Sequence, residues 1–238
     1  MVEEFLVPPV INWVATFLWA ASGGIVAIRK RFDVVGVFVL ALLSATGGGI
    51  IRDGLFLHRT PVVVEDPYYL IVVVFATLVI VALGRNLLQF KYWGELVGLI
   101  DAVATPGFAI VGMQLALSAG ISLPGVVFIG GINGVGGGVL RDLMVGDVPS
   151  ILQPGQLYGL IVGFCCVQFI LLTLQLKIDP ALAGWVTIAT FFLIRVLAIH
   201  YDWKTSPVGG SRSGDHENDS GSVTTSKSQG ILLKSCLT

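Results

Sequence analysis

Two stretches, Gly47-Gly48-Gly49-Ile50-Ile51-Arg52-Asp53 and Gly136-Gly137-Gly138-Val139-Leu140-Arg141-Asp142, share the pattern GGGxxRD and begin 89 residues apart. Other identical residues follow the same offset. They pair Ile11, Val14, Ala15, Thr16, Ala20, Gly23, Ala27, Gly36 and Val37 with Ile100, Val103, Ala104, Thr105, Ala109, Gly112, Ala116, Gly125 and Val126. Apolar composition produces chance matches among alanine, valine and isoleucine, but it does not produce a repeated GGGxxRD. The chain therefore contains an internal repeat.

Both copies lie inside long apolar runs. Hydrophobic residues make up 55% of the chain and charged residues 12%, whereas a soluble domain carries about 25% charged residues. We expect a polytopic helical membrane protein. The net charge of -1 gives no reason to expect a nucleic-acid partner. The N-terminal residues Met1-Val2-Glu3-Glu4 lack a basic signal-peptide region, so we expect the first apolar run to be retained.

Seven spans are expected, because each apolar run is near the roughly 20 residues that cross a hydrocarbon core. They cover about residues 9–28, 34–57, 67–88, 94–118, 123–145, 155–176 and 181–200. Three spans fall in each repeat, an odd number, so the second copy should enter the membrane from the opposite side. The expected fold is all-α, with inverted repeats over residues 1–90 and 91–178 and a seventh helix over 179–202. Residues 203–238 are rich in Ser, Gly and Thr and should form a disordered tail.

Basic residues in the short loops predict the orientation. One side collects Arg29, Lys30, Arg31, Arg85, Lys91, Arg141 and Lys204, and the other Arg52, Arg59 and Lys177. The richer side should be cytoplasmic, which places the N-terminus outside and the C-terminal tail inside.

The glycine triplets of spans 2 and 5 permit two interpretations. Small residues allow close packing between membrane helices. Alternatively, the triplets kink both helices and free backbone carbonyls to line a wet cavity. Their recurrence at symmetric positions favours kinks, which would place carbonyl dipoles where a cation can bind. Inverted repeats with interrupted helices are typical of proteins that move solutes.

Ionisable residues inside spans are the other candidate site. Arg52, Asp53, Arg141 and Asp142 are either interfacial anchors or charged vestibules at the two mouths of a conduit. Adjacent helical residues diverge by about 100°, so each arginine–aspartate pair should need partners elsewhere or water. Further intramembrane polar residues form either a conduit lining or a structural hydrogen-bond network: Asp101, its repeat counterpart Asn12, Thr16, Thr105, Ser44, Thr46 and Asn133. Arg195 is expected to be an interfacial anchor that closes the last span.

The duplicated GGGxxRD segments, the Asp101-Ala102 start of the second repeat and the 3+3+1 layout closely resemble the prokaryotic trimeric intracellular cation (TRIC) channel family, also labelled with a "glycine transporter" domain. The resemblance covers about residues 5–200. It implies a homotrimer in the prokaryotic inner or plasma membrane, with a potassium-permeable pore in each subunit. The triplets Gly47–Gly49 and Gly136–Gly138 would form the constriction kinks, with Ser44, Thr46 and Asn133 near the narrowest part.

The sequence has no P-loop, nucleophile elbow or paired catalytic carboxylate, so we expect no catalysis. No metal-binding constellation includes its histidines, so we expect no structural metal, and permeation would need no cofactor. Membrane lipids and a transient potassium ion near the kinks would be the partners. The lysine–glutamate pair that animal members carry in helix 4 has no counterpart here, because Glu95 has no adjacent lysine. Two other functions stay open: a secondary transporter of a small zwitterion such as glycine, with Asp101 as proton carrier, and a helix bundle without a pathway.

Overall fold

The chain folds into a bundle of long helices in a computed structural model that describes residues 9–153 and 158–201. Its elements are α1 (Pro9–Arg29), α2 (Val34–Ile51), the π-helical turn η2 (Arg52–Leu57), α3 (Val62–Glu65), α4 (Pro67–Ala82), α5 (Gly84–Gln89), α6 (Trp93–Ser118), α7 (Leu123–Met144), α8 (Tyr158–Ile170), the π-helical turn η3 (Leu171–Gln175) and α9 (Pro180–His200). The expected C-terminal tail lies outside the described residues.

Helix ends follow local sequence signals. The Asp33 carboxylate caps the start of α2 by accepting a hydrogen bond from the Gly36 amide at 2.7 Å. The Asp66 carboxylate caps the start of α4 by accepting one from the Tyr68 amide. Gly120 and Gly146 adopt positive φ angles of 75° and 77° just after α6 and α7, a conformation that ends helices and favours glycine.

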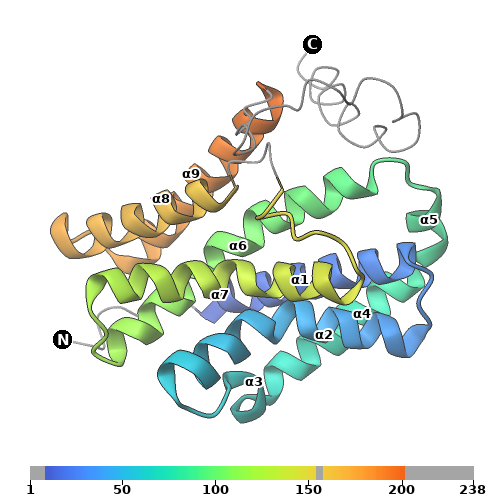
Figure 1. Cartoon of the computed structure of the whole chain (residues 1–238), viewed down its shortest axis with the longest axis horizontal. Coiled ribbons are helices and arrows are strands. Elements are labelled where there is room, and N and C mark those ends of the chain that lie inside the picture. Colours follow the sequence, from blue (N-terminus) through green and yellow to red (C-terminus); the bar gives the residue numbers. More distant parts are fainter. Residues whose placement is uncertain (1–8, 154–157, 202–238) are drawn as a thin grey trace, which may run out of the picture.

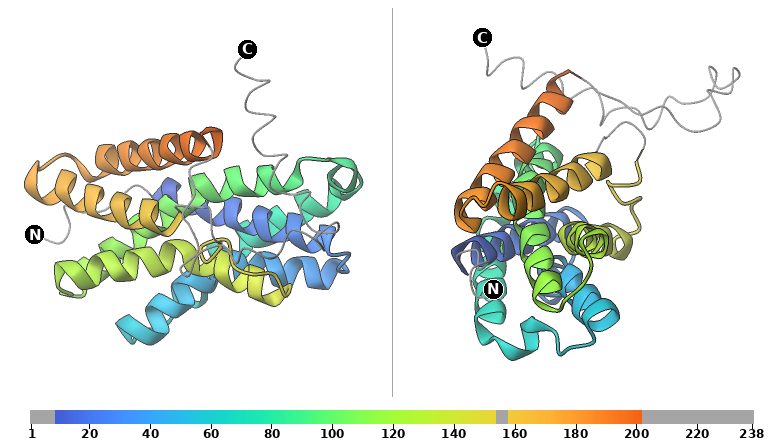
Figure 2. Two further views of the ribbon diagram at one scale, coloured as in Figure 1. Left: turned by 45° about the horizontal axis from the view of Figure 1, so that its top comes forward. Right: turned by 90° about the vertical axis from the view of Figure 1, so that its left-hand side faces the viewer.

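Four helices, α1, α2, α6 and α7, form the centre of the bundle (Figure 1). Helix α4 packs against α1 and α2, whereas α8 packs against α6 and α7 and α9 against α6 and α8. Figure 2 shows α8 and α9 together on one side of the centre and α4 on the other. The repeat thus pairs α1 with α6, α2 with α7 and α4 with α8, and α9 has no counterpart.

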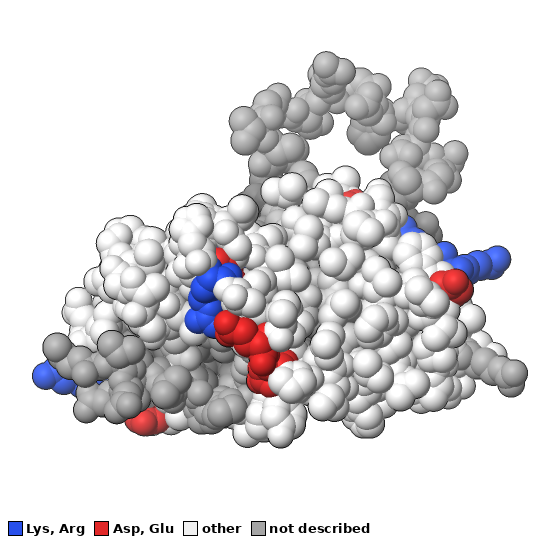
Figure 3. Space-filling model, turned by 90° about the horizontal axis from the view of Figure 1, so that it is seen from below, with Lys and Arg blue, Asp and Glu red and all other residues white. Residues whose placement is uncertain are grey.

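Small residues occupy much of the contact area between the central helices. Ala20, Ala41, Ala45 and Ala104 are all fully buried, which lets helix backbones approach closely. The outside is apolar instead: α4 exposes Ile71, Val74, Phe75 and Leu78 among others. Charged side chains occupy only a few spots on the face seen in Figure 3. An apolar exterior around a small-residue interior is the pattern of a membrane-embedded bundle.

Six helical segments of the described chain are long and apolar enough to cross a membrane: Val10–Arg29, Val34–Leu57, Trp93–Ser118, Leu123–Met144, Tyr158–Gln175 and Pro180–Ala198. The expected third span, 67–88, is interrupted. Its apolar helix α4 ends at Ala82, and the chain turns at Leu83 before α5. The expected span at 67–88 was therefore wrong as one continuous helix, because the turn at Leu83 falls just before the polar stretch Gly84-Arg85-Asn86.

Candidate functional site

The two glycine triplets meet where α2 crosses α7. A Cβ atom on Gly136 would lie 2.8 Å from the Cα atom of Gly48. A Cβ on Gly48 would collide with the carbonyl oxygen of Asn133, and one on Gly137 with that of Ser44. The helices thus touch backbone to backbone, as the close-packing interpretation predicts.

Neither triplet interrupts its helix in this conformation. The α-helical pattern of α2 continues to Ile51 and that of α7 to Met144. The irregular turn η2 begins three residues after the first triplet, at Arg52. A kink at the glycines stays a prediction.

The first charged cluster, the Arg52 cluster, comprises Arg52, Asp53 and Asn133. The Arg52 Nε and Nη2 atoms donate to the two carboxylate oxygens of Asp53 at 2.8 and 2.7 Å, and Nη1 donates to the Asn133 side-chain oxygen at 3.1 Å. All three residues are at least 97% buried. Asp53 also accepts the Val62 amide at 3.1 Å and pairs with Arg59 at 3.6 Å. This cluster therefore joins η2 to α7, to the loop that follows η2 and to the start of α3.

The second cluster, the Arg141 cluster, comprises Arg141, Asp142, Asp101 and Ser22. Arg141 Nε donates to Asp142 at 2.8 Å, and Nη1 donates to both oxygens of Asp101 at 2.9 and 3.0 Å. The Ser22 hydroxyl donates to Asp101 at 2.7 Å and accepts from Arg141. The guanidinium lies over the Trp19 ring at 5.6 Å. Asp142 accepts the Ser150 amide at 3.0 Å.

Each arginine–aspartate pair was expected to need partners elsewhere or water, and each has partners elsewhere: Asn133 and Arg59 for the first pair, and Asp101, Ser22 and Ser150 for the second. Each arginine binds the aspartate that follows it, through a planar guanidinium matched to the carboxylate. The long arginine side chain spans the 100° divergence that a shorter side chain could not. Each arginine also contacts the other repeat: Arg52 reaches Asn133, and Arg141 reaches Ser22 and Trp19.

The smaller predicted polar residues lie in the same interior. Thr16 donates to the Asn12 carbonyl at 2.8 Å, and Thr46 to that of Leu42 at 2.7 Å. The Asn12 amide donates to the Tyr69 hydroxyl. Thr105 shares a hydrogen bond with Tyr158. The Ser44 hydroxyl is buried and has no hydrogen-bond partner among the residues that the structure describes.

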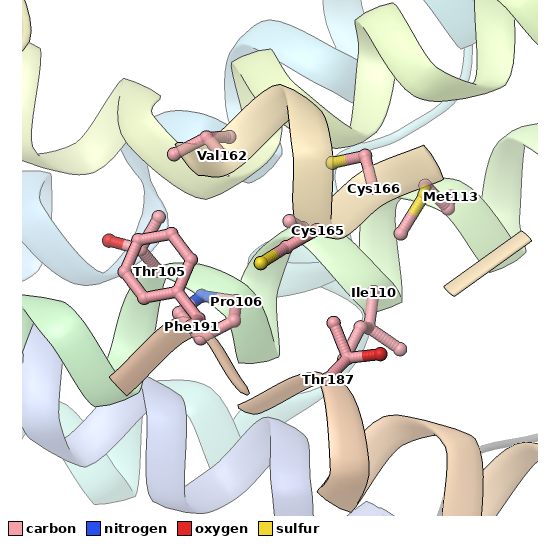
Figure 4. Close-up of a pocket in the computed structure, with 10 residues that line it drawn as sticks. Thr105, Pro106, Ile110, Met113, Val162, Cys165, Cys166, Thr187 and Phe191 are labelled. Atoms are coloured by element: carbon pink, nitrogen blue, oxygen red, sulfur yellow. The ribbon is translucent and has the colours of Figure 1, made fainter. Parts of the chain in front are cut away.

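A polar pocket lies beside the Arg52 cluster. Its polar lining comes from Asn12, Thr46, Arg52, Asp53 and Tyr69, and it has space for about one water molecule. A second pocket, between α6, α8 and α9, differs in character (Figure 4). Mostly apolar side chains line it, among them Cys165 and Phe191, and it is too narrow for water. Of these two pockets between described residues, the first has charged and polar side chains in its lining and could be part of a polar path.

The sequence analysis did not identify several residues of the site. Tyr69 and Tyr158 lie 89 residues apart, so the repeat offset itself could have identified them. Ser22 and Trp19 gave no such signal, because their counterparts are Val111 and Phe108. Arg195, expected to be an interfacial anchor, is 6% exposed, and its guanidinium lies 4.9 Å from the Tyr158 ring centre.

Apolar spans enclosing two buried ion-pair clusters define the class: a polytopic helical membrane protein with a charged interior. The chain belongs to the family described as Glycine transporter, whose model matches residues 9–85 and again residues 98–174. These segments also begin 89 residues apart.

Named relatives and solved structures agree with that family. The chain is 36% identical to a UPF0126 membrane protein of Deinococcus radiodurans over 150 residues, 63% of this chain and 68% of the relative. It is 31% identical to the UPF0126 inner membrane protein YadS of Escherichia coli over 196 residues, 82% and 92% of the two chains. Its fold matches a solved TRIC cation channel with a TM-score of 0.73 and 28% identity, over 87% of this chain and 99% of that one. A TRIC orthologue from Rhodobacter sphaeroides matches with a TM-score of 0.72 and 28% identity, over 79% and 94%.

Proposed function

We propose that this chain is a potassium-permeable channel for monovalent cations. One observation carries the proposal: the glycine triplets of α2 and α7 cross by backbone contact, and a buried Arg–Asp cluster lies near each. This arrangement sits in a fold shared with solved TRIC cation channels. Charged groups inside a membrane bundle are costly and mark pathways for ions or solutes.

The path we propose runs within the subunit, between α1, α2, α6 and α7. It begins at the polar pocket beside Arg52, passes the glycine crossing near Ser44 and Asn133, and continues past Arg141 to the opposite side. In the present conformation α2 and α7 touch at the crossing. Opening would therefore require the two helices to separate there, and bending at the triplets would expose backbone carbonyls to the ion.

The assembly and topology are part of the same proposal. We infer a homotrimer with one pore in each subunit. The analogy is with the Rhodobacter sphaeroides orthologue, which is described as a trimeric intracellular cation channel. We infer two inverted three-helix repeats plus a seventh helix, in which α4 and α5 together serve as the third span. From the basic loops we infer an N-terminus outside and a C-terminus in the cytoplasm, in an inner membrane like that of the Escherichia coli relative.

A second candidate is a secondary transporter of a small zwitterion. The family description names glycine transport, and the Arg141–Asp101 pair presents a cation and a carboxylate, the two charges that would bind a zwitterion. This candidate requires alternating access around one site rather than a continuous path.

Single-channel recording in planar bilayers with asymmetric KCl separates the two. We expect discrete current steps that reverse near the potassium equilibrium potential, and no current from Gly137→Leu. Gly163→Leu is the matched control, because a Cβ on Gly163 meets no atom within 4 Å. If the wild-type protein passes no current but takes up radiolabelled glycine, the channel proposal is wrong and the transporter candidate is supported.

A further inference from the structure

A short segment, residues 59–63, covers the polar pocket beside the Arg52 cluster. Residues 61–63 line the pocket and are half-buried, whereas Arg59 and Thr60 are exposed. The segment therefore lies between the pocket and the surface of the protein. The other lining residues belong to α1, α2, η2, α4 and α6, so this segment is the wall that is not built from a long helix or from the turn that continues one.

Asp53 attaches this segment to the bundle. Its backbone carbonyl accepts the Arg59 amide at 3.0 Å, and its carboxylate accepts the Val62 amide at 3.1 Å. The Arg59 side chain also pairs with the carboxylate at 3.6 Å, but it is 37% exposed, and exposed ion pairs contribute little. A hydrogen bond to an ionised acceptor is stronger than one between neutral groups. The bond from Val62 to the Asp53 carboxylate is therefore the main attachment of the segment.

The same type of bond is present in the second repeat. Asp142, the counterpart of Asp53, accepts the Ser150 amide at 3.0 Å. The repeat offset relates Ser150 to Pro61, the neighbour of Val62. A carboxylate that follows the glycine triplet thus binds the next loop in both copies of the repeat.

The covered pocket has the features of a site for one water molecule. It has space for about one. Asn12 and Tyr69 lie on its wall and bond to each other. The Asn12 Oδ1 atom is buried and has no hydrogen-bond partner within the described part of the chain. A bound water would satisfy this atom, and a larger molecule can enter only if a wall of the pocket moves.

We propose that residues 59–63 form a lid over this water site, and that Asp53 is the latch of the lid. When the bond from Val62 breaks, the lid lifts and the pocket exchanges with the outside solution. The Arg52–Asp53 ion pair lies within η2, so the lid opens without leaving the buried arginine unpaired. Because the pocket begins the proposed ion path, the lid controls the entry of cations. This effect on current rests on the proposed channel, but the latch itself does not.

A thiol in the pocket tests whether the lid opens. Thr46→Cys places one on the wall, at a residue that is 4% exposed and whose hydroxyl bonds the Leu42 carbonyl of its own helix. A methanethiosulfonate reagent is too large for a site of one water, so it modifies this thiol only while the lid is open. In a Cys236→Ala background, the buried thiols of Cys165 and Cys166 report general unfolding.

Two substitutions of Val62 separate the latch from the side chain. Val62→Pro removes the amide that donates to Asp53. Proline fits there because Val62 is the first residue of α3 and Pro61 before it has φ -58° and ψ 134°. Val62→Ala keeps the amide and is the matched control. We expect Val62→Pro to speed modification of the thiol at position 46 by roughly tenfold or more relative to Val62→Ala.

Bilayer recording of the same variants tests the role of the lid in conduction. The lid and the glycine crossing lie in series, so the open probability is proportional to the fraction of time that the lid is open. We expect Val62→Pro to raise the open probability by roughly threefold or more over Val62→Ala.

Each other result overturns a stated part of the proposal. Equal modification rates in Val62→Pro and Val62→Ala would overturn the latch. Modification of the thiol at position 46 as fast as that of an exposed thiol from Thr60→Cys would overturn the lid. Faster modification with unchanged current would overturn its control of cation entry. If no variant passes current and Val62→Pro still speeds modification, the proposed channel is wrong and the latch is supported.

Discussion

The carbonyl oxygen of Ser44 occupies the position that a Cβ atom on Gly137 would need, and the carbonyl oxygen of Asn133 does the same opposite Gly48. Ser44 and Asn133 are themselves repeat counterparts. The crossing of α2 and α7 is therefore a symmetric backbone contact. A glycine in each helix leaves space for a backbone carbonyl of the other helix.

A methyl group at the crossing should be costly. Gly48→Ala or Gly137→Ala places a Cβ against a backbone carbonyl that cannot rotate away, and overpacking costs about 1–3 kcal/mol. We expect both variants to lower the unfolding temperature in detergent by several degrees. Gly49→Ala is the matched control within the same triplet, because its Cβ would meet only Arg52 Nη2, at 3.7 Å. Equal losses in Gly48→Ala and Gly49→Ala would contradict the crossing geometry.

The buried ion pair of Arg141 should contribute far more than a surface pair. Arg141→Gln leaves Asp101 and Asp142 without their shared cation, and breaking a buried pair costs about 3–5 kcal/mol. Lys30 pairs with Asp147 at 2.7 Å, but these side chains are 35% and 50% exposed. Lys30→Gln should therefore cost less than about 1 kcal/mol. Thermal unfolding of the two variants in the same detergent tests this prediction. Similar losses of stability in Arg141→Gln and Lys30→Gln would contradict it.

Asn133 and Ser44 should respond oppositely to truncation. The Asn133 amide accepts from Arg52 and donates to the Phe108 carbonyl, so Asn133→Ala leaves a buried arginine and a carbonyl unsatisfied, at about 1–3 kcal/mol. The Ser44 hydroxyl has no protein partner within the described ranges, so Ser44→Ala should be neutral or slightly stabilising. A large loss in Ser44→Ala, measured by the same unfolding assay, would mean that its hydroxyl binds water or an ion.

The adjacent thiols Cys165 and Cys166 should be inert in the folded protein. They are 3% and 1% exposed and lie in α8 facing the bundle interior. In a Cys236→Ala background, maleimide labelling should be negligible until the protein is unfolded, when both thiols should react. Rapid labelling of the folded protein, followed by mass spectrometry, would show that α8 opens away from α6.

The sequence predicted much of the fold because apolar length and the glycine–arginine–aspartate repeat are direct physical signals. Six of the seven expected spans correspond to spanning helices, and the interruption at Leu83 was missed. Asp101 was expected among the intramembrane polar residues and is buried. Arg52, Asp53, Arg141 and Asp142 were expected to be interfacial anchors or vestibule charges, whereas the structure buries all four.

Their pairing could not be read from spacing. Whether a guanidinium turns back to the next carboxylate depends on its rotamer and on the space that neighbouring helices leave. Arg195 was missed for a related reason, since an arginine near the end of a span has the same sequence pattern whether it points to lipid headgroups or to a buried tyrosine. Ser22 gave no signal because serine is common in membrane helices for packing alone.

Reciprocal contact between the repeats has a consequence for synthesis. Arg52 needs Asn133, which is translated 81 residues later, and Arg141 needs Ser22, translated long before. The first half must therefore wait in the membrane with an arginine whose set of contacts is incomplete, until α7 has been inserted. The Arg52–Asp53 ion pair can form within the first half, but neither half can complete the hydrogen bonds of its arginine alone.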